Sequence, residues 1–235
     1  MSISAAGGCA VVILSAALAG CAGAPAEEGP GLTATLVSPT EISLGWQGFG
    51  DDAVGQVVEF ATEPGGPYTI LEFLPAGERA YRHADLMPET PFYYRVRAVL
   101  GPSSGTVDVV LPDGEPSDED TRDGHEWAAP RVLPGGVGPP VSIRGGGGAP
   151  TGLTAVVRHA DGIWFRWTDN AGDEEGFLIE ARPRGHAEFR VAAVVDPNVN
   201  SFGLVTLPDE KAAAYRVRTF YFGQQTRVAH QRTGR

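Results

Sequence analysis

A repeat at long spacing constrains this chain more than any other feature. The phrase Tyr-Arg-Val-Arg occurs twice, beginning at Tyr94 and at Tyr215, and the same offset of 121 positions places Trp46 on Trp167. The offset stays constant across these landmarks, so the two copies differ by no net insertion or deletion. A fixed offset of this kind predicts two copies of one structural unit.

The repeat also sets the domain boundaries. We place the copies at residues 31–111 and 150–230, and about 80 residues suffice for a small domain with its own core. Between them, residues 112–149 are first acidic and then rich in Gly and Pro. Such a composition disfavours regular structure. We therefore expect a flexible, disordered linker that leaves the two domains free to orient independently.

Apolar residues alternate with polar ones within each copy. Segments 41–46, 56–60 and 68–73 have strand length and are separated by Gly, Pro and Asp, whereas no ten-residue segment keeps a helical period. In the segment 94–98 a period of two puts both Arg on one face and the apolar residues on the other. The pattern predicts an all-β fold of two seven-stranded β-sandwiches.

Landmark residues of both copies match the pattern of one known family of β-sandwich domains. Trp46 matches the core tryptophan of that family, and residues 164–170 and 176–180 of the second copy match its second and third strands. The residues of the first copy that match the family's pattern before and within its sixth strand are Leu86, Pro88, Thr90, Phe92, Arg95, Val96 and Ala98. Both copies thus resemble fibronectin type III domains of the kind found in bacterial secreted proteins, and the resemblance implies a tandem pair of such sandwiches.

Both copies depart from the family at its corner tyrosine, whose hydroxyl bonds to the backbone upstream in such sandwiches. Phe92 occupies that position in the first copy and Ala213 in the second. We therefore expect this hydrogen bond to be absent from both domains, at a cost of about 0.5 to 1.5 kcal/mol each.

Charged residues also repeat, and alternation predicts that they pair across neighbouring strands. Glu59 is expected beside Arg95 and Arg97 on an outward, solvated face of the sheet. The second copy repeats the scheme with Glu180, Arg216 and Arg218. Four further arginines are candidates for a patch that binds an acidic glycan or protein: Arg182, Arg184, Arg190 and Arg227.

The N-terminal segment contains an apolar run at residues 10–19, which is far too short to span a bilayer and is followed closely by Cys21 in the sequence Leu-Ala-Gly-Cys. It therefore resembles the signal peptide of a bacterial lipoprotein, a family in which the cysteine of this pattern is lipidated. The resemblance implies a signal peptide at residues 1–20, a lipid on Cys21 and a tether at residues 21–30. The first residues carry no Lys or Arg, unlike an ordinary signal peptide, and the alternative is a secreted protein without a lipid.

Candidate catalytic and metal-binding patterns have simpler structural interpretations. Residues 101–105 read Gly-Pro-Ser-Ser-Gly and fit a nucleophile motif, but we expect a hairpin turn there because no helix follows. The acids at residues 169–175 are dense enough to attract Ca²⁺ but do not follow the spacing of a calcium loop. The five histidines show no metal-ligand spacing: they are His83, His125, His159, His186 and His230.

These observations exclude some classes of function and favour others. A net charge of −11 argues against a nucleic-acid-binding protein. We predict no enzyme, cofactor or metal, and instead a protein anchored in the bacterial envelope, at the outer membrane or the cell surface. It would present its modules to an envelope protein or polysaccharide. The alternative is an accessory or spacer subunit of an extracellular hydrolase complex.

Overall fold

The computed structural model describes residues 29–114 and 127–235, which form strands and two single-turn 3-10 helices, η1 (Ile143–Gly145) and η2 (Pro208–Glu210). The strands are β1 (Leu32–Ser38), β2 (Glu41–Trp46), β3 (Gly55–Ala61), β4 (Thr69–Pro75), β5 (Ala80–His83), β6 (Pro91–Leu100), β7 (Val107–Val110), β8 (Val137–Val141), β9 (Thr151–His159), β10 (Gly162–Ala171), β11 (Gly176–Pro183), β12 (Arg190–Val195), β13 (Ser201–Val205), β14 (Ala212–Gln225) and β15 (Ala229–Arg232). The predicted all-β fold of sandwich-like sheets is confirmed.

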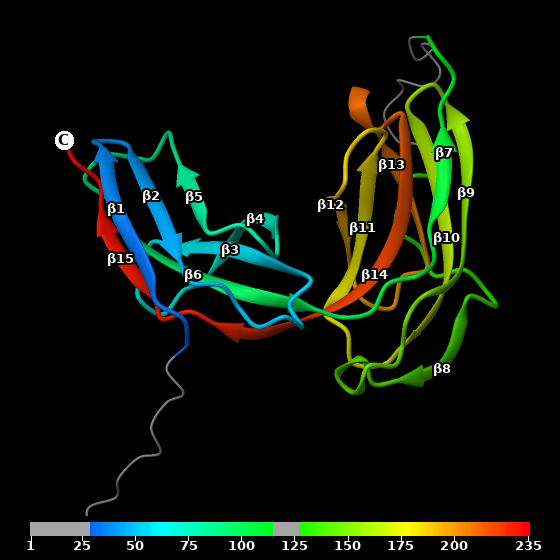
Figure 1. The fold of residues 1–235 in the computed structure, drawn as a ribbon, viewed down its shortest axis with the longest axis horizontal. Coiled ribbons are helices and arrows are strands. Elements are labelled where there is room, and N and C mark those ends of the chain that lie inside the picture. The colour runs from blue at the N-terminus through cyan, green and yellow to red at the C-terminus, as the bar shows by residue number, and fades with distance from the viewer. Residues whose placement is uncertain (1–28, 115–126) are drawn as a thin grey trace, which may run out of the picture.

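The strands gather into two lobes, seen on the left and right of Figure 1. In the first lobe, the sheet β1-β2-β5 packs against β4-β3-β6-β15. Alternating residues of β2 point inward, and Ile42, Leu44 and Trp46 of this strand are almost fully buried. Phe92, on β6, completes the same cluster from the facing sheet.

The second lobe repeats this architecture. The sheet β9-β10-β13 packs against β12-β11-β14-β7 around a core that contains Phe165, Trp167 and Phe177. Trp167 is 3% exposed and Trp46 is 7% exposed, so both repeat tryptophans lie in the cores as predicted. The periodicity of two therefore identified the inward face correctly in both copies.

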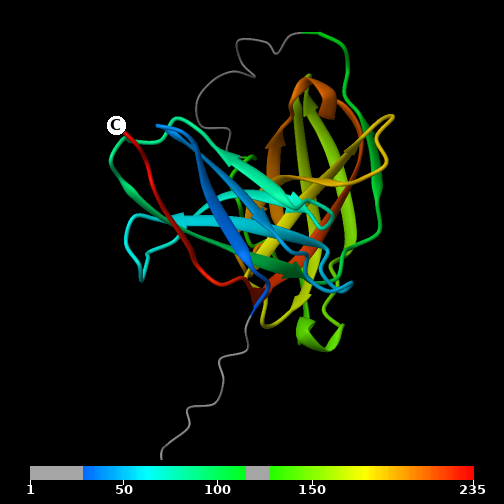
Figure 2. The same cartoon turned by 60° about the vertical axis from the view of Figure 1, so that its left-hand side comes forward.

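The two lobes exchange their last strands. β7 follows β6 of the first lobe in the chain, yet it pairs with β14 in the second lobe, where Val109 lies opposite Ala213. β15 follows β14, yet it pairs with β6 in the first lobe, where His230 lies opposite Tyr93. Figures 1 and 2 show the green segment after β6 and the red segment after β14 running past each other between the lobes. Each sandwich is thus completed by the segment that follows the other one.

The two crossing strands also pair with each other, antiparallel. Leu100 of β6 lies opposite Tyr221 of β14, and Val99 lies opposite Phe222. This pairing joins the larger sheets of both lobes into one sheet in the order β12-β11-β14-β6-β3-β4. The lobes are therefore held together by a backbone ladder, and the expectation of independently oriented domains is wrong.

The segment after β6 is a crossing and not a hairpin turn, which corrects the prediction for residues 101–105. Gly101 has φ +137°, and a Cβ there would lie 2.1 Å from the carbonyl oxygen of Thr219, so the close approach of the two chains requires glycine. Ser104 then bonds to the backbone of Val217 through both its amide and its hydroxyl. These bonds direct the chain onward into the second lobe.

The expectation that the corner hydrogen bond is missing is wrong for the second lobe. Tyr215, two residues after the position of the family pattern, donates its hydroxyl to the carbonyl oxygen of Glu210 at 2.6 Å. In the first lobe the equivalent Tyr94 is fully buried, and its hydroxyl lies 3.0 Å from Nδ1 of His83 instead. Burial is the main cause of a raised pKa at Tyr94.

Residues 127–149 are not a disordered linker, because they cover the edge of the second lobe. Arg131 exchanges two backbone hydrogen bonds with the strand-edge segment at Asn200 and Ser201, and the amide side chain of Asn200 holds the backbone of Leu133 from both sides. β8 then pairs in parallel with the end of β10. The Gly and Pro content here permits close packing, and only residues 115–126 of the predicted linker lie outside the described residues.

The strand exchange predicts that two halves of the chain complement each other in trans. Fragments 29–114 and 127–235 each lack the strand that completes their own sandwich. We expect neither alone to show a cooperative thermal transition and the mixture to form a one-to-one complex that does, measured by circular dichroism and size-exclusion chromatography with light scattering. Two fragments that fold separately and stay apart would contradict the exchange.

Two glycines of the crossing segment provide a matched pair for this experiment. Gly101→Ala places a methyl group against the backbone of Thr219, whereas a Cβ added at Gly105 would meet nothing within 4 Å. We expect Gly101→Ala to weaken association of the fragments at least about tenfold, equivalent to about 1.4 kcal/mol, and Gly105→Ala to leave it nearly unchanged.

Candidate functional site

The charged ladders predicted from the repeat are present, but they are buried. Glu59 accepts hydrogen bonds from Arg95 and Arg97, and Glu180 accepts them from Arg216 and Arg218. The pairing was predicted correctly. The prediction of a solvated face was wrong, because Glu59 is 2% exposed and Glu180 is 5% exposed.

Aromatic rings and the crossing chain cover these ladders. The Arg97 guanidinium lies 3.5 Å from the centre of the Phe222 ring, which the exchange brings from β14. Arg218 donates to the carbonyl oxygen of Gly101 at 2.6 Å. Burial lowers the pKa of Arg218, and the neighbouring Glu180 carboxylate opposes this shift. The ladders therefore act as structural groups of the junction between the lobes.

A hydrophobic cluster lies between the lobes beside the ladders. Its buried members come from both lobes: Val57 and Val99 from the first, Leu178 and Phe220 from the second. Phe73 packs edge-on against Phe220, with ring centres 5.8 Å apart. Apolar side chains that alternation would assign to an outer face are thus used as an interface between the two lobes.

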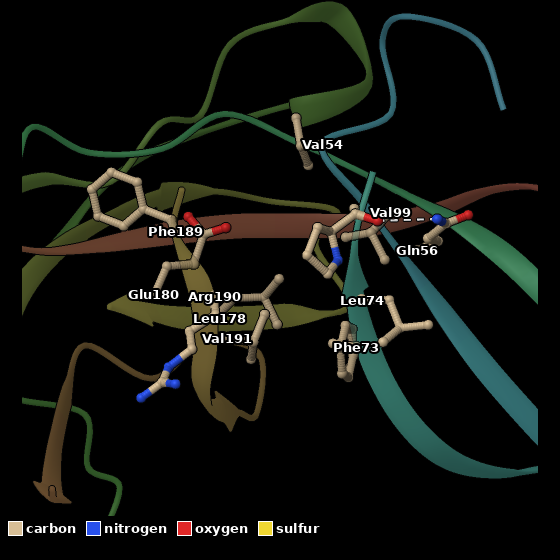
Figure 3. A pocket seen from close by; sticks show the side chains of 12 residues that line it. Val54, Gln56, Phe73, Leu74, Val99, Leu178, Glu180, Phe189, Arg190 and Val191 are labelled. Atoms are coloured by element: carbon tan, nitrogen blue, oxygen red, sulfur yellow. Dashed lines mark hydrogen bonds between the residues drawn. The ribbon is translucent and has the colours of Figure 1, made fainter. Parts of the chain in front are cut away.

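The outermost strands of the joined sheet approach each other beside this cluster. β4 and β12 are the two ends of the sheet, and each pairs with one other strand among the described residues. Phe73 of β4 and Val191 of β12 both pack on the cluster. A small pocket lies where the two strands approach each other, and Figure 3 shows Phe73 and Leu74 on one side of it and Leu178 and Val191 on the other. The sheet therefore curls until its two edges face each other.

Beyond this contact the edges diverge into a groove of about 460 Å³, which we call the edge groove. Its lining consists of residues 70–73 of β4 and residues 191–194 of β12. Successive residues of a strand point to opposite faces of the sheet. Four consecutive residues of each strand can therefore line one groove only if the groove runs along the edges of the two strands. Ile70 and Val194 are 43% and 49% exposed there. The groove presents apolar side chains and unpaired strand edges together.

A second surface of aromatic and cationic side chains lies on the other sheet of the second lobe. Trp164 points outward from β10 and donates its indole N–H to the hydroxyl of Ser201 at 2.7 Å. The guanidinium groups of Arg158 and Arg166 lie 5.9 and 5.3 Å from its ring centre. We call this the tryptophan–arginine face. The alternation in residues 164–167 could have identified it, since it puts Trp164 and Arg166 on the face opposite the core.

The four arginines of the predicted patch are divided between the lobes. Arg227 lies at the first lobe, where its amide bonds to Pro30, because the exchange carries the chain away after β14. Arg190 pairs with Asp209 and Glu210. Arg182 stacks on Phe189. Arg182 and Arg184 both line one polar depression, together with His186.

The acids at residues 169–175 are engaged in local hydrogen bonds. Asp173 accepts from the hydroxyl of Ser142 and the amide of Ile143, and these bonds lower its pKa. Glu174 accepts from the amide of Asn198. Within residues 29–114 and 127–235, no group of three or more His, Cys, Asp or Glu is placed to hold a metal ion. Asp173 and Glu174 thus hold the backbone of neighbouring loops.

The histidines that the sequence analysis considered have different neighbours in the structure. His83 lies beside Tyr94, His159 pairs with Asp161, and His230 stacks on Tyr93. The signal peptide, Cys21 and His125 lie outside the described residues. No helix in the described part of the chain is long and apolar enough to cross a membrane.

Comparisons with solved structures return fibronectin type III domains. A fibronectin type III-like protein from Clostridium thermocellum is 31% identical over 31% of this chain and 75% of its own, with a TM-score of 0.28. The sixth fibronectin type III domain of a human protein is 24% identical over 34% of this chain and 76% of its own, with a TM-score of 0.27. A two-domain fibronectin type III segment of chicken tenascin is 13% identical over 87% of this chain and 98% of its own, with a TM-score of 0.27. No family model and no curated protein matches the chain.

The buried ladder predicts a large cost for removing its acid. Glu180→Ala leaves the Arg218 charge buried without its carboxylate, and we expect a loss of about 3 to 5 kcal/mol in the free energy of unfolding, measured by urea denaturation. Glu41→Ala is the matched control, because it removes the carboxylate partner of Arg82, which is 71% exposed, and should cost under about 1 kcal/mol. Equal losses in the two variants would contradict the burial of the ladder.

Proposed function

We propose that this chain is a lipid-anchored envelope protein built from two fibronectin type III domains, and that it binds a partner without catalysis. The edge groove carries this proposal, because it combines exposed apolar side chains with strand edges that pair with no further described strand. Exposed apolar surface of this kind marks sites of interaction. A spacer needs no such surface, which favours a binding protein over a purely structural one.

The chemistry of the groove fits binding better than turnover. Glu72 is the one ionisable side chain in its lining, and the remaining lining residues are apolar. Acid–base catalysis needs a positioned group with a matched pKa, usually supported by a second polar group. A partner that buries apolar surface and pairs with backbone would gain its affinity here without any such chemistry.

The tryptophan–arginine face supports a second candidate function, the binding of a polysaccharide. Trp164 offers a partly exposed aromatic ring, and Arg158 and Arg166 add positive charge beside it. Aromatic rings that bury one face and keep a polar edge are common in binding surfaces. Acidic sugars are the polysaccharides that this charge would favour.

Two variants separate the proposed surfaces. Purified residues 29–235 would be immobilised and exposed to an envelope extract and to a glycan array. If the groove binds a protein, Val194→Lys should reduce capture of one defined band at least about tenfold, equivalent to about 1.4 kcal/mol, while Trp164→Ala leaves it intact. Binding lost only in Trp164→Ala, with a signal on acidic glycans, would favour the polysaccharide instead. Equal capture by both variants and the parent chain would contradict both.

The anchor is tested separately by the mass of the mature protein. We expect the full chain, expressed in a bacterium, to begin at Cys21, to carry a diacylglyceryl group there and to fractionate with membranes. Cys21→Ala should abolish the lipid and release the protein from the membrane fraction. An intact Met1 in the soluble fraction would contradict the anchor while leaving the binding proposal open.

A further inference from the structure

We propose that the edge groove binds an extended segment of a partner protein as an added β-strand on β12. This inference rests on the proposed binding function of the groove and specifies the chemistry of its partner. The groove is lined by consecutive residues of two strands, so it presents backbone donors and acceptors. An added β-strand would form hydrogen bonds with these backbone donors and acceptors and would place its side chains on both faces of the sheet.

β12 is the less protected edge of the two. Natural edge strands are blocked by charges, proline or irregular geometry. The only charged residue in β12 is Arg190, at its first position, and this side chain is occupied by Asp209 and Glu210. The following residues, 191–195, are all Val or Ala. A β-bulge at Ala192 interrupts the pairing of β12 with β11, so residues 193–195 are the part of this edge in continuous register. β4 instead carries Glu72 within the groove and ends in Pro75.

The opposite wall determines what kind of strand fits. The added strand would pair with β12 and have β4 on its other side, so it would extend the curled sheet across the gap between its two ends. Its side chains would pack against Ile70 and Val194, which are now partly exposed. Removing these apolar side chains from water would stabilise the complex. Glu72 favours a Lys or Arg at the adjoining position of the partner.

A second copy of this chain fits the groove less well than a free segment. Symmetric pairing of two β12 edges would bring the β11 and β14 strands of the second copy, together with its β12, against the β4 wall of the groove. A single extended segment avoids this collision. The groove is also continuous with the hydrophobic cluster between the lobes, so a bound strand would extend an interface that already exists.

A peptide selection tests this proposal with a defined probe. A phage-displayed library of random peptides of about ten residues, the length of a strand, would be selected on residues 29–235 and counter-selected on Val194→Lys. We expect enrichment of peptides with alternating apolar residues and a basic residue. Their affinity should fall at least about tenfold in Val194→Lys, equivalent to about 1.4 kcal/mol, and be unchanged in Trp164→Ala.

Backbone chemistry then distinguishes an added strand from simple apolar contact. N-methylation of alternate residues of a selected peptide removes the hydrogen-bond donors along one of its edges. We expect one methylation register to abolish binding and the other to reduce it less, with slower amide hydrogen exchange in residues 193–195 of the complex. Binding that tolerates both registers, or failure to enrich alternating peptides, would overturn the strand proposal. Groove-dependent capture from envelope extracts would still support the proposed function in that case.

Discussion

The reciprocal exchange of β7 and β15 is the constraint on which the rest of the structure depends. The larger sheet of each lobe needs one more strand, beside β6 in the first lobe and beside β14 in the second. Each lobe receives this strand from the segment that leaves the other lobe. The exchange makes β6 and β14 cross, and the crossing joins two sheets into one. The buried ladders, the hydrophobic cluster between the lobes and the edge groove all follow from that junction.

The sequence predicted the parts of this structure that are local or repeated. Alternation placed Trp46 and Trp167 inward, and the constant offset paired Glu59 with Arg95 and Arg97 in the same way as Glu180 with its two arginines. These features depend on strand periodicity and on neighbours within one sandwich, which the pattern of a single strand contains. The sequence also predicted correctly that each ladder points away from the core of its own sandwich. It did not predict that the ladders are buried.

The partner of each final strand could not be predicted, because both choices present the same local pattern. Val107 and Val109 alternate inward whether β7 pairs with β6 or with β14. The physical difference lies outside the strand, in a crossing that requires Gly101 to approach the Thr219 carbonyl and in apolar outer faces that bury each other. Burial of the charged ladders follows from the same long-range contact. The sequence of the linker likewise did not reveal that Asn200 would hold Leu133 by two hydrogen bonds.

The two copies have also diverged at the position next to the core tryptophan. In the first lobe Trp46 donates its indole N–H to Gln56 at 2.8 Å. The repeat places Phe177 at the equivalent position, and the buried indole nitrogen of Trp167 has no hydrogen-bond partner among the described residues. An unsatisfied buried donor costs about 1 to 3 kcal/mol, so the second lobe carries a penalty at this position that the first lobe does not.

Cysteine cross-linking within one molecule tests the strand exchange most directly. Residues 29–235 contain no native cysteine, so pairs can be introduced cleanly. Val110→Cys with Ala212→Cys joins β7 to the strand it faces in the exchanged form, where these two positions are directly opposite. Val110→Cys with Pro91→Cys joins β7 to the equivalent position of its own lobe. Exchange predicts a disulfide in the monomer of the first variant and free thiols in the second; a disulfide in the second variant and none in the first would show that each lobe keeps its own last strand.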